Sequence, residues 1–240
     1  MFLALQSHID SLKSGLTAKQ IETAKIIPLP NFHFSGFHPD TCYVLSTRRK
    51  NEQIPSAAGA YHSILAFTAF MLGKSADEAL TLFRQETYEA LGFLHEFERS
   101  KKALMQQFRA SSLSMDARFI NWTRKGVFMH TQNHPHLHCL HDVARAVCEV
   151  HFPDFQDYRH PLPDYLSDLM IYPCYPEIAE RRGAVGSLLF KVTAQDKALP
   201  LEAFVRQTFE IYNRHGRRAM QISPAFQTRY DEVSAYIQGN

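Results

Sequence analysis

The run Ser35-Gly-Phe-His-Pro-Asp40 places an imidazole directly before a proline, and the run Met129-His-Thr-Gln-Asn-His-Pro135 does the same much later in the chain. Each run follows an apolar stretch that is typical of a strand, and each proline fixes its own backbone angle φ. α/β proteins commonly place catalytic and binding side chains where a strand ends and a loop begins. We therefore expect the two histidine–proline runs to meet at one cleft beside neighbouring strands.

The composition is that of an ordinary globular protein. Hydrophobic residues make up 45% and charged residues 21% of the 240 residues, which argues against disorder. The net charge of +2 gives no general reason to expect nucleic-acid binding, although it allows a local cationic pocket. No apolar run approaches the roughly 20 residues of a membrane-spanning helix. The cysteines form no CxxC pair and the first residues lack a basic signal region, so we expect free thiols and a cytoplasmic location.

The periodicity of the chain predicts a helix-rich α/β fold, with a single domain over residues 1–240 and a small, mainly parallel sheet. Short apolar pieces predict strands at residues 2–5, 25–29, 42–45 and 126–129. Amphipathic spacing and capping residues predict helices at residues 16–24, 58–73, 75–91, 93–111, 135–151, 201–214 and 226–236.

The first histidine–proline run carries a hydroxyl, an imidazole and a carboxylate within six residues. His38 is a candidate general base, Asp40 is the carboxylate that could orient it, and Ser35 supplies the hydroxyl. Gly36 allows a close backbone approach or a positive φ. Side chains two apart on a proline-fixed turn rarely point together, so a second interpretation stays open. In that interpretation Asp40 caps the next element and His38 fills the wall of a pocket.

The second run is rich in imidazole and supports three interpretations. If a helix begins at Pro135, then His134, His138 and His141 lie on one side of it, which is workable geometry for a metal ion. Alternatively, Asn133 caps that helix, and the free N–H groups of its first turn bind a phosphate or carboxylate. In the third interpretation Asn133 is only a cap and the histidines lie at the surface.

Several other side chains have a functional and a structural interpretation. His62 in an apolar segment is more typical of a hydrogen-bonded core residue than of a catalyst. The apolar residues after Cys42 indicate a buried, unreactive thiol. Five cationic side chains could bind phosphate or could simply be solvated: Arg48, Arg49, Arg181, Arg182 and Lys191. Four tyrosines in a proline-rich segment could stack on sugar rings or pack on the rest of the protein: Tyr158, Tyr165, Tyr172 and Tyr175.

Two longer stretches, Ile27-Pro-Leu-Pro-Asn-Phe-His-Phe-Ser-Gly-Phe-His-Pro-Asp40 and Phe128-Met-His-Thr-Gln-Asn-His-Pro135, resemble the WcbI-like family of capsular polysaccharide biosynthesis proteins. Gly186-Ser-Leu-Leu-Phe-Lys191 continues the resemblance more loosely. The resemblance implies an acyltransferase that uses coenzyme A or acetyl-coenzyme A and acts on a sugar or polysaccharide acceptor. It implies catalytic roles for His38, Ser35, Asp40 and His130, and cofactor binding by Asn133, His134, Thr131 and Gly36.

The chain departs from the family pattern at its start. Proteins of this kind open with a strand and a Gly-Asn-Cys-Gln-type turn ahead of the segment equivalent to Phe2–Leu5, and we expect that segment to be missing here. If that turn supplies a nucleophilic thiol or oxyanion donors, this chain binds its ligand without turning it over. Two alternative functions remain: a metal-assisted hydrolase built on His134, His138 and His141, and a non-catalytic module that binds carbohydrate or a partner.

Overall fold

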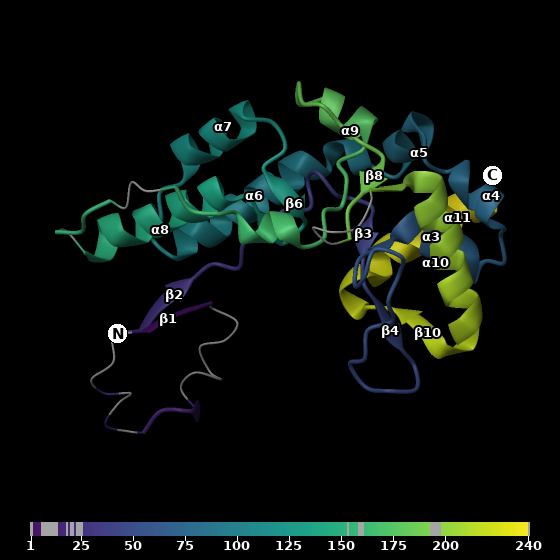
Figure 1. The fold of residues 1–240 in the computed structure, drawn as a ribbon, viewed down its shortest axis with the longest axis horizontal. Coiled ribbons are helices and arrows are strands. Elements are labelled where there is room, and N and C mark those ends of the chain that lie inside the picture. Colours follow the sequence, from purple (N-terminus) through teal and green to yellow (C-terminus); the bar gives the residue numbers. More distant parts are fainter. Residues whose placement is uncertain are drawn as a thin grey trace.

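The computed structural model describes residues 2–5, 14–17, 19, 22, 26–152, 154–157, 161–192 and 198–239. Helices dominate its regular structure (Figure 1), and the helix predicted at residues 16–24 lies mostly outside the described residues. No helix in the described ranges is long and apolar enough to cross a bilayer. The longer helices are α3 (Ile64–Met71), α4 (Ala76–Leu80), α5 (Gln85–Ala90), α6 (Glu96–Ala110), α7 (Asp116–Arg124), α8 (Leu137–His151), α9 (Pro176–Glu180), α10 (Leu201–His215) and α11 (Gln227–Gly239). Single 3-10 turns lie at Phe93–His95, Tyr165–Asp168, Arg217–Ala219 and Pro224–Phe226.

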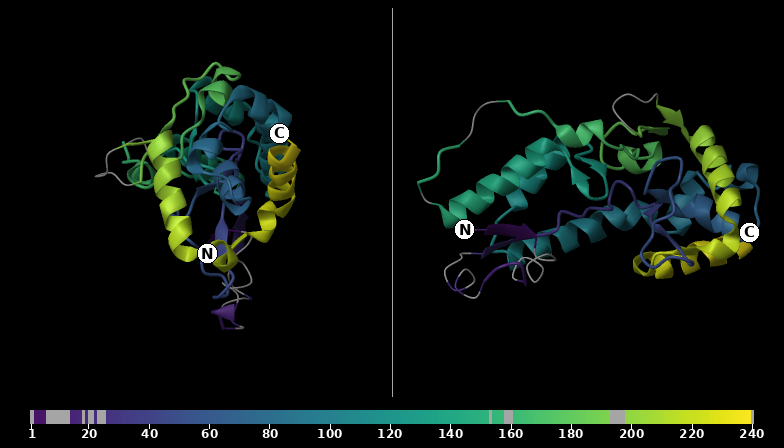
Figure 2. Two further views of the ribbon diagram at one scale, coloured as in Figure 1. Left: turned by 90° about the vertical axis from the view of Figure 1, so that its right-hand side faces the viewer. Right: turned by 60° about the horizontal axis from the view of Figure 1, so that its bottom comes forward.

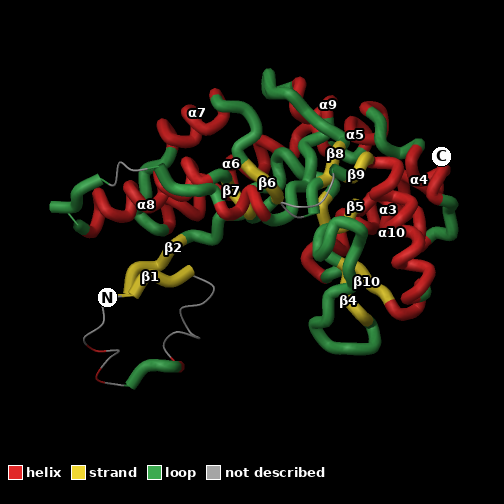
Figure 3. The backbone as a smooth tube through the Cα atoms, in the orientation of Figure 1, coloured by secondary structure: helices red, strands yellow, loops and turns green. Residues whose placement is uncertain are grey.

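The strands are short and pair in twos (Figure 3). β1 (Phe2–Leu5) and β2 (Ile26–Leu29) are parallel. The other pairs in the described residues are antiparallel: β3 (Thr41–Cys42) with β5 (His62–Ser63), β4 (Val44–Ser46) with β10 (Met220–Ile222), β6 (Met129–Thr131) with β7 (His134–Pro135), and β8 (Leu189–Phe190) with β9 (Leu199–Pro200). The predicted helix-rich α/β class is confirmed, but the pairing is mainly antiparallel. Adjacent parallel strands need long crossover connections, whereas β6 and β7 here are joined by a tight turn.

Helix α3 is the buried centre of one end of the molecule. Every residue from Ile64 to Phe70 is buried. Helices α10 and α11 lie on either side of it (Figure 2, left), and they contribute buried side chains such as Tyr212 and Val233. The predicted helix over residues 58–73 therefore begins later than expected, at Ile64, because the residues just before it pair as strand β5.

The two ends of α3 are fixed by their capping residues. Ser63 accepts a hydrogen bond from the N–H group of Ala66 at 3.0 Å, which satisfies one free donor of the first turn. Gly73 has a φ of +83°, and its N–H group donates to Phe70 while that of the following residue donates to Ala69. This pattern is a Schellman cap, in which glycine accepts the left-handed conformation without strain. The predicted helix stop at Gly73 is confirmed.

A cluster of aromatic rings fills the region between α6, α7 and the two histidine–proline runs. The ring of Phe128 lies 5.0 Å from the rings of both Phe34 and Phe37, measured between centroids. Phe97 of α6 and Phe119 of α7 pack against the same rings. All five are buried. Since such rings each remove a large apolar area from water, this cluster holds the two runs against the helices.

Gly36 lies where the first run passes α6 most closely. A Cβ atom at this position would lie 2.6 Å from the ring of Phe34 and 2.8 Å from the Cα atom of Phe97. The predicted reason for this glycine, a close backbone approach, is confirmed, and a positive φ is not required.

We predict that Gly36→Ala lowers the free energy of unfolding by about 1–3 kcal/mol, because the added methyl group overlaps with the backbone of a packed helix. Gly239→Ala is the matched control, since a Cβ there would meet nothing within 4 Å. Urea unfolding of both variants measures the difference. Equal stability of the Gly36→Ala variant and the control would contradict this account of the contact.

Candidate functional site

The two histidine–proline runs lie side by side, but the cavity beside His130 is not lined by the first run, so the expectation that they meet at one cleft is not confirmed. The N–H group of Phe34 donates to the carbonyl oxygen of Gln132 at 2.7 Å, which joins the two runs directly. The N–H group of Tyr172 donates to the carbonyl oxygen of His130 at 2.9 Å and adds a third segment to the same place. Three segments that are distant in the sequence therefore form one unit.

His38 is buried within this unit and is not part of the lining of the cavity beside His130. Its side chain is only 1% exposed, and its ring meets the ring of Tyr172 edge-on with centroids 6.1 Å apart. Burial lowers the pKa of His38 to about 3, and the nearby backbone of Tyr172 offsets only part of this effect. Among the residues that the structure describes, neither ring nitrogen has a hydrogen-bond partner of good geometry. His38 is thus a neutral imidazole behind Tyr172, and the structure supports the interpretation that it fills a wall.

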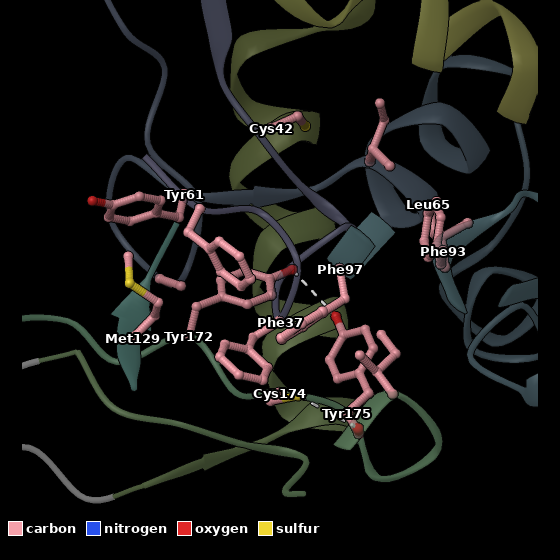
Figure 4. Packing of buried hydrophobic residues seen from close by; sticks show 14 of the residues in the cluster. Phe37, Cys42, Tyr61, Leu65, Phe93, Phe97, Met129, Tyr172, Cys174 and Tyr175 are labelled. Atoms are coloured by element: carbon pink, nitrogen blue, oxygen red, sulfur yellow. Dashed lines mark hydrogen bonds between the residues drawn. The ribbon is translucent and has the colours of Figure 1, made fainter. Parts of the chain in front are cut away.

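Asp40 does not orient His38 but is the centre of another hydrogen-bond network. Its Oδ2 atom accepts from the hydroxyl groups of Tyr175 at 2.7 Å and Tyr172 at 3.1 Å, and its Oδ1 atom accepts from the N–H group of Leu65 at 3.1 Å. The two tyrosine hydroxyls also lie 3.2 Å apart (Figure 4). Burial raises the pKa of Asp40 to about 6, although these donors favour the ionised form. The structure therefore supports the capping interpretation of Asp40, at the N-terminus of α3.

Ser35 is also separated from His38. Its hydroxyl donates to Glu96 Oε1 at 2.6 Å and lies 2.7 Å from the hydroxyl of Ser100. Arg229 of α11 binds the other carboxylate oxygen of Glu96 at 3.2 Å. Because its hydroxyl is engaged with α6, Ser35 anchors the run to that helix and does not form a catalytic set with His38 and Asp40.

The second run forms a hairpin before the helix begins. Strands β6 and β7 pair across a turn that contains Asn133, and α8 starts at Leu137, two residues later than predicted. Asn133 therefore does not cap the helix. Its Oδ1 atom instead accepts from the hydroxyl groups of Tyr61 at 2.7 Å and Thr131 at 3.0 Å.

The metal-binding interpretation of His134, His138 and His141 is not supported by the described residues. His134 lies in strand β7, so it is not in helical register with His138 and His141. His141 instead lies 3.5 Å from Asp157. Among the residues that the structure describes, no three His, Cys, Asp or Glu side chains are grouped to hold a metal ion. The metal-binding interpretation assumed one continuous helix from Pro135, whereas α8 starts only at Leu137.

An internal carboxylate occupies the position that was predicted to bind an anion. The N–H group of Leu137 donates to Asp164 Oδ2 at 2.9 Å, at the first turn of α8. His130 Nε2 lies 3.2 Å from the same oxygen atom. Although partial burial acts to raise the pKa of Asp164, these two hydrogen bonds outweigh it and hold the pKa below its usual value. Asp164 is thus an ionised partner of His130 at neutral pH.

A second imidazole stacks on His130. The ring of His136 lies 4.1 Å away with an interplanar angle of 26°. Burial, with a further contribution from His130, lowers the pKa of His136 to about 4. Because this ring is neutral at pH 7, it stacks without charge repulsion and can donate or accept a hydrogen bond.

A cavity of about 400 Å³ opens beside these imidazoles. Its polar lining comes from His130, His136, Tyr172, Ser187 and Lys191, together with Cys174. Burial raises the pKa of the Cys174 thiol to about 12, so the thiol is protonated and weakly nucleophilic at neutral pH.

His130 and Lys191 were predicted from the sequence, but Asp164 and His136, which contact His130, were not. His136 was visible in the imidazole-rich run, whereas Asp164 carried no local signal because it reaches His130 from a distant segment. Tyr172 and Tyr175 are both buried, which favours the interpretation that they pack on the rest of the protein over stacking on sugar rings. Tyr165 is exposed, and Tyr158 lies outside the described residues.

Two structural interpretations made from the sequence are confirmed. The Nδ1 atom of His62 lies 2.6 Å from the hydroxyl of Tyr212, and its Nε2 atom lies 2.8 Å from the carbonyl oxygen of Ile54. Burial lowers the pKa of His62 to about 4, so it is a satisfied core residue. Cys42 is fully buried, and burial raises the pKa of its thiol well above the usual value.

Comparison with known proteins identifies related sequences and folds. The family model described as polysaccharide biosynthesis enzyme WcbI matches residues 12–151, which is more than half of the chain. A solved structure of WcbI, described as a novel polysaccharide biosynthesis enzyme in a native form without a disulfide bond between coenzyme A and a cysteine, is similar in fold. The TM-score is 0.59 and the identity 14%, over 89% of this chain and 69% of that one. No curated protein matches the sequence.

The buried titratable groups predict how stability depends on pH. His38 and His62 have pKa values of about 3 and about 4 in the fold, below their ordinary value of 6.5, so the unfolded chain gains their protons first as pH falls. Asp40 acts in the opposite direction between its folded pKa of about 6 and its ordinary value of 3.8. Near pH 5 the unfolded chain therefore holds roughly one more proton on these groups, and stability falls by about 1.4 kcal/mol per pH unit.

Urea unfolding followed by the fluorescence of Trp122, the single tryptophan, measures this at pH 7, 6 and 5. Asp40→Asn removes the opposing carboxyl group and should make the decline steeper below pH 6. Stability that is constant or rises as the pH falls to 5 would show that the two imidazoles are not held neutral by burial.

Proposed function

Because the chain belongs to the WcbI family of polysaccharide biosynthesis enzymes, we propose that it transfers an acyl group from a coenzyme A-type thioester to a hydroxyl group of a sugar or polysaccharide. The observation that carries this proposal is His130, which pairs with the ionised Asp164 at the wall of the 400 Å³ cavity. The solved WcbI structure, whose description mentions coenzyme A, supports the choice of donor. We also propose that the chain forms one domain and that it works in the cytoplasm. Its four cysteines are all free, which is compatible with that location.

The residues at the cavity are compatible with the reactive end of such a donor. An acyl-coenzyme A would supply an activated acyl group at a thioester carbonyl. The neutral imidazole of His136, the hydroxyl of Ser187 and the ammonium of Lys191 are suited to hold its polar thioester and amide groups. The neutral state of His136 follows from its pKa of about 4, and it leaves the cavity wall polar without adding positive charge.

His130 is proposed to act as the general base. Since Asp164 is ionised, the Nε2 atom of His130 is the donor in their hydrogen bond, so the Nδ1 atom is the nitrogen assigned to proton exchange with the acceptor. When it is unprotonated, an imidazole nitrogen can accept the proton of an acceptor hydroxyl group as that oxygen attacks the acyl carbon. The C–S bond of the thioester would then break, and the imidazolium would return the proton to the departing sulfur, which gives the free thiol and the neutral base. Asp164 fixes the tautomer and stabilises the imidazolium that results, as the carboxylate does in other His–Asp pairs.

Lys191 is proposed to stabilise negative charge that develops on the acyl oxygen. Its ammonium group lines the cavity and donates to the carbonyl oxygen of Ser167, which fixes its position. A fixed cation needs little reorganisation during the reaction. Cys174 is not assigned as a nucleophile because its thiol is protonated, so the proposal is direct transfer to the acceptor.

The other residues predicted from the sequence have supporting roles in this proposal. His38 is assigned as a positioning residue behind Tyr172, which lines the cavity, and Asp40 holds the hydroxyl of the same tyrosine. Gly36 and Ser35 fix the first run against α6. Asn133 and His134 of the β6–β7 hairpin are proposed to bind the donor near the cavity, and the buried Thr131 is proposed to position Asn133 through its hydroxyl group.

We predict that His130→Gln lowers the rate of acyl transfer by about 10²–10⁴-fold, because it removes the base while keeping a hydrogen-bonding side chain. Asp164→Asn should lower it as well, since the tautomer of His130 is no longer fixed. Transfer is measured as thiol release from acetyl-coenzyme A in the presence of sugar acceptors. Calorimetric titration with coenzyme A measures donor binding separately.

His95→Gln is the matched control, because His95 is exposed at the start of α6 and should leave the rate unchanged. If the unaltered chain binds coenzyme A but transfers no acyl group to any acceptor, the chain is a binding module. If it binds no coenzyme A, the proposed donor is wrong.

A further inference from the structure

A second cavity, of about 510 Å³, lies between α6, α7 and the residues that follow α9. It is rich in positive charge. Lys101 of α6, Arg124 at the end of α7, and Arg181 and Arg182 after α9 all line it, whereas Glu98 is the only carboxylate among its lining residues. Arg181 and Arg182 belong to the cations for which the sequence left both phosphate binding and simple solvation open.

The positive charge of this cavity is only partly balanced. Arg182 pairs with Glu98 at 2.9 Å, and Arg181 pairs with Glu89 at 3.1 Å. Arg124 forms no ion pair or hydrogen bond with another residue in the described part of the chain, and Lys101 forms no ion pair with a described residue. Two cationic groups therefore remain available to an anion.

The cations are placed over an apolar floor. The guanidinium of Arg182 lies 4.0 Å from the centroid of the Phe97 ring, and the ammonium of Lys101 lies 5.6 Å from that of Phe119. Both rings are almost fully buried, so they position the cations without adding competing polar groups. Cations from three separate elements thus converge on one recess, which distinguishes this site from charges scattered on a surface.

The two cavities are neighbours along the same pair of segments. The 400 Å³ cavity beside the imidazoles is the first cavity. Gly126 and Gly183 line the second cavity, and Val127 and Val185 line the first. A Cβ atom on Gly126 would lie 3.9 Å from the Cβ atom of Ala184, so the two segments are in contact at the boundary. A ligand that extends across this boundary would reach the imidazoles in one cavity and the cations in the other.

We propose that the second cavity binds the phosphate-bearing part of a substrate whose reacting group lies in the first cavity. This deepens the proposed function and rests on it. Arginine and lysine side chains are the usual ligands of phosphate groups, and arginine can bind two oxygen atoms at once. The phosphate belongs to one of two sources: the nucleotide portion of the acyl donor, or a phosphorylated sugar acceptor.

The test compares the double variant Lys101→Gln/Arg124→Gln with the unaltered chain. Coenzyme A and pantetheine, which lacks the nucleotide, are titrated by calorimetry, and a hexose 1-phosphate is titrated against the free hexose. The unaltered chain should bind one phosphorylated probe at least about tenfold more tightly than its phosphate-free counterpart, and the double variant should lose this difference. Loss with coenzyme A assigns the donor, and loss with the hexose phosphate assigns the acceptor.

Arg214→Gln is the control, because Arg214 is exposed in the last turn of α10 and remote from the site in the sequence. If the double variant binds every phosphorylated probe as tightly as the unaltered chain does, or if the unaltered chain shows no preference for phosphate, the inference is wrong. Acyl transfer from a short thioester without phosphate, such as acetyl-N-acetylcysteamine, tests the function separately. The double variant should retain activity with this short thioester. If the variant loses only the binding of coenzyme A, the phosphate site is affected. If the unaltered chain does not use the short thioester, the proposed acyl transfer itself is in question.

Discussion

The buried carboxylate of Asp40 is the constraint on which the arrangement of the site depends. It receives hydrogen bonds from the first turn of α3 and from the hydroxyls of Tyr172 and Tyr175. A buried acid is costly unless donors surround it, so the first run, the central helix and the segment around Tyr172 must come together for the chain to fold. The first histidine–proline run is thus primarily a means of joining three segments. The cavity beside His130 follows from this, because Tyr172 forms part of both.

The division between the buried and the accessible imidazoles follows from the same packing. His38 lies behind Tyr172, where burial keeps it neutral and out of contact with the cavity. His130 lies on the other side, where Asp164 can reach its Nε2 atom from a distant segment. A proline after each histidine suggested two equivalent turns, but their surroundings differ. The aromatic rings packed around Phe128 close the first turn, whereas the β6–β7 hairpin leaves His130 at a cavity wall.

Local patterns in the sequence were sufficient for some features and insufficient for others. The helix stop at Gly73 and the core role of His62 were predictable, because each depends on neighbouring residues or on general burial. The contact between the two runs was expected from their similar places after strands. The start of α8 was misplaced because the hairpin pairing of His134 and Pro135 overrides a favourable helix start. Asp164 could not be found, since a single acid in a proline-rich segment has no periodicity that indicates its partner. The mostly antiparallel pairing was missed for a similar reason, because two-residue strands leave almost no pattern.

The two cavities differ in the charged side chains that line them. Near the imidazoles, where a proton must be accepted, burial keeps His136 neutral, and the ionised carboxylate of Asp164 faces the Nε2 atom of His130. Around Phe97 and Phe119 the cations stay at an accessible rim, where water limits the cost of leaving two of them without an acidic partner. The cavity beside the imidazoles has one cationic side chain in its lining, Lys191, whereas four line the second cavity. A larger group of cations beside His130 would make its protonation by the acceptor hydroxyl less favourable. In the proposed function, the contact between Gly126 and Ala184 lies between the group that binds phosphate and the base that accepts the proton.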